Sequence, residues 1–584
     1  MTSADKSRST PDLSEDHRMK RLTLSIATGL LAIGSITSVV AQDAASTILL
    51  NGKIVTVDDY FSIQEAVAIQ GDRIVAVGSD AEIRALAGPS ARTIDLGGRT
   101  VIPGLIDNHN HVIRATEYWP NEARLDGVTS RVEALALLEA KADALPAGEW
   151  LMSLGGWSEN QFVGDKSDFT LEELDEIAPN RPTFIQSTYD HAFGNSAWFN
   201  EMGVPLVANY EQRAEATGVA AHVVRDETGT ATGRLNGGIA MVNLALQRFP
   251  EVTAERQSDA IKTAFSYLNS IGLTSVYDPA GVGIRTESYA RIRALADEAG
   301  LTVRVFHTLG GGVPGTPEEA RAVVEEIRAA RPFQGDAMVD LIAVGEIYYG
   351  PFHWDSLFVP KTPNAADLAA GTSILTAAAA GGWQVQTHAS QPETIDLLLD
   401  VMTDINAEYP LRQLRWSITH ADLVGSEQIE RMRHLGMNLQ LRSVSVTMQP
   451  RRVTLIEELG EAAYHIPPLR LVQDSGIPWG LGTDGTKATQ INPFVTLGWA
   501  VTGLALNGEK VLAETLTREE ALIAHTRSNA YLMFQESNIG AIRPGLLADM
   551  LVLDRDYLTI PVNEIMKILP VATLVGGEIV YGAL

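Results

Sequence analysis

The sequence predicts an α/β fold: a (β/α)8 barrel of the TIM type, with a large insertion after strand 1 and a small β-sandwich formed by both termini. Three observations support this prediction. Several apolar, strand-like runs end in histidine or aspartate, as at the edge where such barrels place their sites. Strand-like runs alternate with capped helices through the middle of the chain. Short strands separated by turns occupy both ends.

The two ends of the chain share a strand–turn–strand pattern. Near the N-terminus, Thr47–Leu50 and Lys53–Val57 flank the turn former Asn51-Gly52. Strand-like runs separated by turn residues occur again at Asp549–Leu553 and at 572–581. Both ends lie outside the expected barrel, so we expect residues 42–100 and 539–584 to build one β-sandwich together.

The first chemical signal is a pair of histidines at the end of an apolar run. Val101–Ile106 is expected to be one buried strand, and we assign residues 101–112 to barrel strand 1. His109 and His111 are two residues apart, so both imidazoles project from one face. Two imidazoles on one edge provide half of a transition-metal site. Taken alone, the pair is equally compatible with a structural role.

Three later runs also end in a residue of the metal-ligand type. The run 383–387 ends at His388, the run 414–419 ends at His420, and the run 478–483 ends at Asp484. In a (β/α)8 barrel the C-terminal ends of all strands meet on one face. We therefore expect these three side chains to lie near His109 and His111.

The spacing between strand 1 and the next barrel strand predicts an inserted subdomain. Residues 113–250 are far more than a βα loop needs, and we expect strands in them at Trp150–Leu154 and Pro182–Ser187. The rest of the barrel is assigned to residues 251–538. Helix starts there include the capping boxes that begin at Thr316 and Thr517.

The five candidate ligands resemble the metal site of the amidohydrolase superfamily. In that pattern strand 1 supplies His-x-His, strands 5 and 6 one histidine each, and strand 8 an aspartate. The resemblance covers the chain from about Ala44 to Leu584. Further motifs resemble the large-insert subgroup that includes N-substituted formamide deformylase; they are residues 156–160, 190–196 and 542–554. The chain departs from relatives after His388, where Ala389-Ser390 replaces a Gly-Asp pair.

The resemblance also implies a ligand at the end of strand 4, where many two-metal members carry a carboxylated lysine. The corresponding run, Met338–Gly345, contains no lysine and is followed by Glu346. A glutamate already has the charge and the two oxygens of a carbamate, so we assign Glu346 as the bridging ligand. There are two alternatives. The site holds a single metal ion and Glu346 is not one of its ligands, or Glu346 is a surface residue just past the strand. Asp340 interrupts the same apolar run without an evident reason.

The resemblance implies a metal-dependent hydrolase that cleaves a C–N bond in a linear amide, formamide or carbamate. Two divalent metal ions, expected to be Zn²⁺, would acidify a shared water. Asp484 would accept its proton and return it to the leaving nitrogen. Hydrolysis of esters, lactones or cyclic amides, deamination, and a non-catalytic metal-binding barrel are the alternatives. The chain has no cysteine, which excludes thiolate nucleophiles and Cys-ligated zinc.

His191, Trp157, Tyr348 and Arg442 are further candidates for substrate binding, and three neighbouring residues are considered with them. His191 matches the subgroup's Asp-His-x-x-x-Asn motif, and a structural role is equally open for it. Trp157, with Phe162, would wall the pocket or belong to a core. Tyr348 follows Glu346 on the strand-4 loop, as do Tyr349 and His353. Arg442 ends strand 7 and would bind a substrate anion or pair with an acidic neighbour.

The composition limits the class of partner. Of 584 residues, 45% are hydrophobic and 20% charged, which is typical of a globular protein. The net charge of −27 argues against nucleic acid, because no basic excess is available to meet phosphates. We expect a small-molecule substrate and leave a homo-oligomer open.

The N-terminus predicts export. Residues 19–41 read as a basic segment, an apolar segment and small residues before a cleavage point after Ala41, which is typical of a signal peptide. Residues 1–18 would be an upstream extension. A secreted or periplasmic enzyme is expected, without stable membrane insertion after cleavage. An uncleaved membrane anchor is the alternative.

Overall fold

The computed structural model describes residues 44–584, apart from positions 116, 282, 311, 313, 354, 356–358 and 444–454. The expected extension at 1–18 and the expected signal peptide at 19–41 lie outside the described residues. Among the helices that are described, none combines the length and apolarity that crossing a membrane requires.

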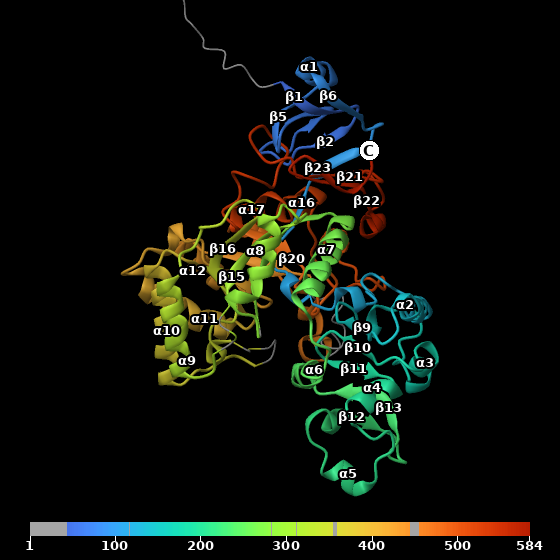
Figure 1. Ribbon diagram of the computed structural model, residues 1–584. Helices are drawn as coiled ribbons and strands as arrows, with labels where there is room; N and C mark the ends of the chain where they lie inside the picture. Colours follow the sequence, from blue (N-terminus) through green and yellow to red (C-terminus); the bar gives the residue numbers. More distant parts are fainter. Residues whose placement is uncertain are drawn as a thin grey trace, which may run out of the picture. The chain divides into compact units, whose positions relative to one another are not determined.

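Eight parallel strands form the central barrel (Figure 1). In order around the sheet they are β8 (Leu105–Asp107), β14 (Leu273–Asp278), β15 (Arg304–Leu309), β16 (Val339–Val344), β17 (Gln384–Ala389), β18 (Ser417–His420), β19 (Asn438–Arg442) and β20 (Trp479–Gly482). The first and last strands approach each other just past their ends, where the His111 amide donates to the Gly485 carbonyl (2.6 Å). Nearly all strand residues are buried because helices cover the barrel, as expected for a parallel sheet.

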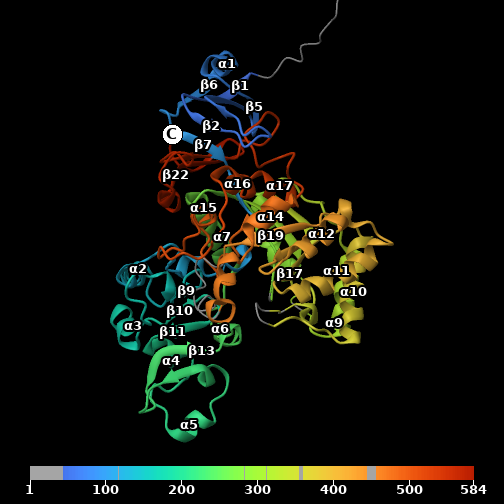
Figure 2. The same cartoon turned by 180° about the vertical axis from the view of Figure 1, so that it is seen from behind.

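The covering helices alternate with the strands. They are α7 (Ala254–Ser270), α8 (Ala290–Asp297), α9 (Pro317–Ala329), α10 (Ala365–Ala380), α11 (Pro392–Asn406), α12 (Ser426–Leu435), α14 (Leu469–Ser475), α15 (Pro493–Thr502), α16 (Arg518–Ala524) and α17 (Arg527–Leu532). Helices α10, α11 and α12 pack one against the next, and α10 contacts β17 (Figure 2). The expected capping boxes are present: Thr316 accepts from the Glu319 amide, and Thr517 from the Glu520 amide.

Two sheets built from the chain ends form the β-sandwich. One has the order β5–β4–β1–β6, and the other β23–β22–β21–β7–β2–β3. Their strands are β1 (Ala45–Leu50), β2 (Lys53–Val55), β3 (Ile63–Gln64), β4 (Ala66–Gln70), β5 (Arg73–Gly78), β6 (Ala87–Asp95), β7 (Thr100–Pro103), β21 (Met550–Leu553), β22 (Pro570–Val575) and β23 (Glu578–Gly582), with helix α1 (Asp80–Ala85) between β5 and β6. Apolar residues from both termini, among them Leu49, Val101 and Val552, share one core.

The run expected to be a single barrel strand is two strands in two different sheets. β7 pairs with β2 and β21 in the sandwich, whereas β8 pairs with β14 in the barrel. The break falls at Gly104, where a side chain would lie 2.2 Å from the Thr274 hydroxyl of β14. The expectation of one strand over Val101–Ile106 was therefore wrong, because an apolar run does not show which of two cores each half enters.

The chain between β8 and α7 contains a sheet of its own. Its strands have the order β12–β13–β11–β10–β9, with β9 at Leu151–Leu154, β10 at Thr183–Ser187, β11 at His191–Gly194, β12 at Val223–Arg225 and β13 at Ala231–Asn236. Helices α2 (Arg131–Ala144), α3 (Leu171–Ile177), α4 (Ser196–Glu201), α5 (Tyr210–Ala214) and α6 (Gly238–Leu246) belong to the same segment (cyan to green in Figure 1). We call residues 113–250 the insert. It has two apolar clusters of its own, around Phe184 and around Trp157.

Candidate metal centre

Six buried or nearly buried side chains meet at the C-terminal end of the barrel strands. They are those expected from the sequence: His109 and His111 after β8, Glu346 after β16, His388 in β17, His420 at the end of β18, and Asp484 after β20. Parallel strands bring their C-terminal ends to one edge, which explains how residues almost 400 positions apart meet.

Glu346 lies at the middle of this group. Its Oε2 is 2.9 Å from His109 Nε2 and 3.4 Å from His420 Nε2, while its Oε1 is 3.9 Å from His111 Nε2. Asp484 Oδ1 is 3.3 Å from His111 Nε2 and 3.6 Å from His109 Nε2. One carboxylate oxygen thus faces His109 and His420, and the other lies nearer His111.

The donor atoms form three overlapping groups whose members lie within 4.8 Å of one another. The groups are His109, His111 and Glu346; His109, His420 and Asp484; and Glu346, His388 and His420. Glu346 and two of the histidines each belong to more than one group. Nitrogen and carboxylate donors at these separations suit Zn²⁺ or a similar divalent ion.

Several atoms of this group have no hydrogen-bond partner although they are buried. These are His109 Nε2, His420 Nε2 and Glu346 Oε2. Buried polar atoms are nearly always hydrogen-bonded, so an unpartnered set facing one point needs an explanation. Coordination of a cation satisfies all three at once, and the residues therefore fit a metal ion.

Contacts on the far side of two histidine rings fix their orientation. His111 Nδ1 donates to the Ala280 carbonyl (2.9 Å), which directs Nε2 at Asp484 Oδ1 (3.3 Å). His109 Nδ1 lies 3.1 Å from the Thr419 hydroxyl. Partners of this kind set the tautomer and the ring plane of a metal-binding histidine.

In His388 the two ring nitrogens exchange roles: the outer partner is on Nε2, and Nδ1 is the nitrogen without a partner. Its Nε2 lies 3.3 Å from Asp355 Oδ1, whereas its Nδ1 is buried without a hydrogen-bond partner. Asp355 is held in turn by the Ser390 and Gln391 amides, each 2.8 Å from Oδ2. His388 is therefore placed to offer Nδ1 to the centre. Sequence reasoning missed Asp355, because one acidic residue in a loop carries no signal of its own.

Charges around Asp484 keep it ionised. Arg442 forms ion pairs with both Asp484 and Asp422. Burial opposes ionisation, but Arg442 and the neighbouring histidines hold the pKa of Asp484 far below its ordinary value. Of the two roles expected for Arg442, the structure shows the pairing with acidic neighbours.

Two of the other ligand candidates, His420 and Glu346, are set for neutral imidazole and ionised carboxylate, whereas contact with Asp484 raises the pKa of His111 against the effect of burial. Burial, reinforced by Arg442 and His388, lowers the pKa of His420 to about 3. Burial opposes the ionisation of Glu346, yet His109 and His420 lower its pKa well below the usual range. Metal binding requires neutral imidazole and charged carboxylate, so both shifts favour it.

The backbone at the site is strained at two of the expected ligands. His420 has a φ of 72° and Asp484 a φ of 66°, both in the left-handed region. Nearby, the buried carboxylate of Asp107 accepts from the Thr483 amide (2.9 Å) and hydroxyl (2.6 Å) and from the His109 amide (3.2 Å). Asp107 thus ties the strand-1 end to the strand-8 end and holds both in position.

The other expected residues mostly serve the core. Tyr348 is buried, approaches the Thr387 hydroxyl (3.2 Å) and packs edge-on against His353. Trp157 is fully buried in a stack with Phe162 and belongs to the insert core. Asp340, which interrupts β16, accepts from the Gly335 amide (2.7 Å).

His191 is placed in the insert sheet and contacts Glu159, 2.9 Å from its Nε2. With Asp168 these two form a separate trio of donors, but Asp168 pairs with Arg234. His191 belongs to none of the donor groups around Glu346.

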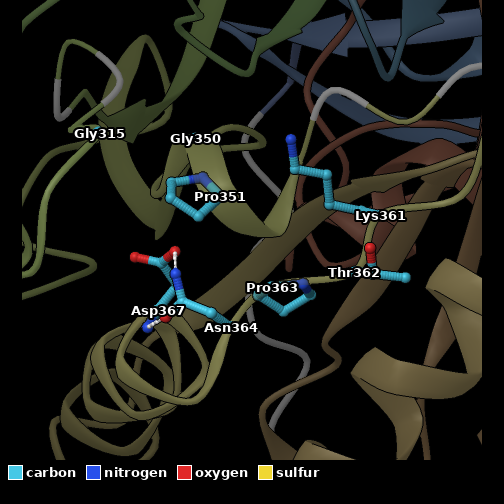
Figure 3. A pocket seen from close by; sticks show the side chains of 8 residues that line it. All are labelled: Gly315, Gly350, Pro351, Lys361, Thr362, Pro363, Asn364 and Asp367. Carbon is cyan, nitrogen blue, oxygen red and sulfur yellow. Dashed lines mark hydrogen bonds between the residues drawn. The ribbon is translucent and has the colours of Figure 1, made fainter.

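A cavity of about 570 Å³ lies beside the loop that follows β16 (Figure 3). In it the Asn364 amide donates to Asp367 at the start of α10 (2.7 Å). None of the six expected ligands lines it; its walls are Gly315, Gly350, Pro351, Lys361, Thr362, Pro363, Asn364 and Asp367.

The model of a family described as the amidohydrolase family matches residues 92–581 of this chain. N-substituted formamide deformylase of Arthrobacter pascens is 28% identical over 560 residues, which cover 91% of this chain and 98% of the relative. Protein LONG AFTER FAR-RED 3 of Arabidopsis thaliana is 24% identical and covers 92% of each chain.

Solved structures agree in fold. An uncharacterized metal-dependent hydrolase from Pyrococcus horikoshii superposes with a TM-score of 0.60 at 21% identity, covering 88% of this chain and 99% of the other. A second, from Pyrococcus furiosus, gives 0.58 at 20% identity, covering 88% and 100%.

Proposed function

The chain belongs to the amidohydrolase family and is a hydrolase of C–N bonds, and on this premise we propose that it cleaves a linear amide, formamide or carbamate at a two-metal centre. The observation that carries the proposal is the position of Glu346. Its two oxygens face different histidines, and its Oε2 is buried without a hydrogen-bond partner.

We assign the metal ligands as His109, His111, Glu346, His388, His420 and Asp484. Imidazole nitrogens and carboxylate oxygens, with no cysteine in the chain, favour Zn²⁺. When bound, such ions supply Lewis acidity, which acidifies a water and polarises a carbonyl.

Asp484 is the proton carrier in this proposal. Arg442 holds its carboxylate in place and keeps it ionised, so it is ready to accept a proton at neutral pH. The same carboxyl then delivers that proton to the leaving nitrogen. Because the proton is returned, no covalent bond between enzyme and substrate is required.

The choice of substrate class is supported by the deformylase relative, which this chain matches over nearly its whole length. The same ligands could also serve hydrolysis of an ester, a lactone or a cyclic amide, or a deamination. The experiment below distinguishes these reactions, and it also distinguishes metal binding without catalysis.

The experiment combines metal analysis with a substrate panel. We expect about two zinc-like ions per chain and hydrolysis of N-benzylformamide, N-benzylacetamide or a benzyl carbamate in preference to phenyl acetate and a lactone. Glu346→Gln should lose metal and activity. Asp340→Asn, which alters a buried carboxylate on the preceding strand, is the matched control and should keep both. One ion per chain together with an active Glu346→Gln variant would contradict the bridge.

We also propose that residues 19–41 direct export to the periplasm or the medium and are then removed. The support is the sequence pattern alone. N-terminal sequencing of protein secreted by a bacterial host should begin at Gln42; a protein retained in the membrane with residues 19–41 intact would contradict removal.

A further inference from the structure

The insert carries one phenol toward the metal centre. Tyr189 is the middle residue of the three that join β10 to β11, so it lies at the tip of a hairpin. Its hydroxyl oxygen accepts a hydrogen bond from Arg114 Nη1 (2.5 Å). Arg114 lies in the short helix η1 (Val112–Ala115), which directly follows the His109–His111 pair.

Arg114 and the expected ligand His111 both approach the same glycine, Gly281. A side-chain Cβ at Gly281, whose φ is +103°, would be 2.5 Å from Arg114 Nη2 and 3.3 Å from His111 Cε1. Only glycine leaves room for the guanidinium and the imidazole at this point. The carboxylates of Asp484 and Glu346 act electrostatically on the Tyr189 hydroxyl, and Glu346 acts on Arg114. The phenol thus belongs to the surroundings of the centre.

The hairpin tip is held on one side by a motif that resembles the subgroup and on the other by the start of α6. The Thr188 amide donates to the Trp157 carbonyl (3.1 Å), and the Gly238 amide donates to the Asp190 carbonyl (3.1 Å). The Trp157 segment also contacts the strand-8 loop, because the Gly156 amide donates to the Lys487 carbonyl (3.0 Å). These contacts tie Tyr189 to the loop that bears Asp484, which gives the phenol a defined position.

The Tyr189 hydroxyl can donate a hydrogen bond. Arginine only donates, so the bond from Arg114 uses a lone pair of the phenol oxygen and leaves its O–H uncommitted. Within the described part of the chain, the Tyr189 hydroxyl makes no other hydrogen bond. Burial raises the pKa of Tyr189 despite the opposing effect of Arg114, so the phenol stays protonated at neutral pH.

We propose that Tyr189 is a catalytic residue that donates a hydrogen bond to the acyl oxygen of the substrate, with Arg114 as its positioning residue. The proposal rests on the proposed amide hydrolysis. Water oxygen bonds to the acyl carbon, the carbonyl π pair moves onto the acyl oxygen, and the Tyr189 O–H stabilises the charge that develops there. The C–N bond then breaks, and the nitrogen takes its proton from Asp484. Tyr189 keeps its own proton throughout.

The test is Tyr189→Phe, which removes only the hydroxyl. We expect kcat on the best amide of the panel to fall about 10²–10³-fold, as for loss of one oxyanion donor, with little change in KM and no change in metal content. Arg114→Met should show a smaller fall of the same kind. Tyr118→Phe is the matched control: it removes another insert phenol, which donates to the Pro250 carbonyl (3.0 Å), and should keep full activity.

A binding measurement separates catalysis from structure. An N-benzyl phosphonamidate imitates the tetrahedral, anionic species, and calorimetry should show that Tyr189→Phe binds it at least about tenfold more weakly, whereas Tyr118→Phe binds it as the wild type does. An active wild type whose Tyr189→Phe variant equals it in kcat and in phosphonamidate affinity overturns this inference alone. A wild type that neither hydrolyses the amides nor binds the phosphonamidate overturns the proposed function as well.

Discussion

The barrel edge and the insert both reach the metal centre, but they position their side chains by different means. At the edge, each expected ligand sits at or just after the end of a parallel strand, so the sheet itself sets its place. In the insert, Tyr189 is placed by a hairpin tip and by hydrogen bonds to segments far away in sequence. The strand ends of the barrel can therefore hold the same ligands while sequence changes in the insert alter the side chains that approach those ligands.

The largest effect that this comparison predicts belongs to the barrel edge. Asp484→Asn should lower kcat/KM about 10²–10⁴-fold, because the amide can neither accept the proton of the attacking water nor return it. Steady-state kinetics on the best amide measures this. Asp422→Asn, which alters the other partner of Arg442, is the control and should lose far less activity. Equal losses in the two variants would mean that the ion pair, and not proton transfer, is what matters.

The second prediction concerns a loop residue that supports an edge ligand. Asp355→Asn should weaken metal binding about 10–100-fold, because the negative partner of His388 Nε2 is lost. Competition with a fluorescent chelator gives the affinity. Asp367→Asn, which alters the acceptor of the Tyr349 hydroxyl, should bind metal normally. If the metal affinity of Asp355→Asn is unchanged, Asp355 does not support His388, and its role is limited to accepting hydrogen bonds from the Ser390 and Gln391 amides.

The third prediction is a displacement of the pH profile. Arg442 lowers the pKa of Asp484, so Arg442→Met should raise it toward its ordinary value. The proposed mechanism needs Asp484 ionised, so activity should be lost as pH falls through its pKa, and the acid limb of kcat/KM should move to higher pH in the variant. Arg442→Lys keeps the charge and should show a smaller displacement. An acid limb that stays in place in Arg442→Met would show that another group sets it.

The smallest effect on catalysis is expected in the insert core. Trp157→Ala should destabilise the protein by about 3–5 kcal/mol, since a fully buried indole is lost from a stack with Phe162. Denaturant unfolding measures this. At a temperature where the variant is folded, KM should be close to that of the wild type. A large increase in KM with normal stability would restore Trp157 as a pocket residue.

The comparison also explains what the sequence could predict. His109, His111, His388, His420 and Asp484 were found because the end of an apolar run marks a strand end, and parallel strand ends converge. Glu346 needed the family pattern in addition. Their roles as ligands stay predictions until metal is measured.

The features that were missed depend on contacts between distant segments. Nothing local distinguishes Asp355 from the other loop acids. Tyr189 lies two residues before the expected His191, but only the hairpin shows which of the two side chains approaches Arg114. The division of the first apolar run into β7 and β8 depends on Thr274, some 170 residues away, which leaves no room for a side chain at Gly104.

The position of β7 has a consequence for the order of assembly during synthesis. Strand β7, which precedes β8 in the chain, lies between β2 and β21, and β21 begins only at Met550. The buried ion pair between Arg304 and Asp549 joins the same late segment to the barrel. Chains emerge from the ribosome N-terminus first, so the sandwich sheet that adjoins the segment leading to β8 is complete only when the last tenth of the polypeptide has been made. We therefore expect metal to be acquired after release, and a nascent chain stalled before β21 to leave the ion in solution.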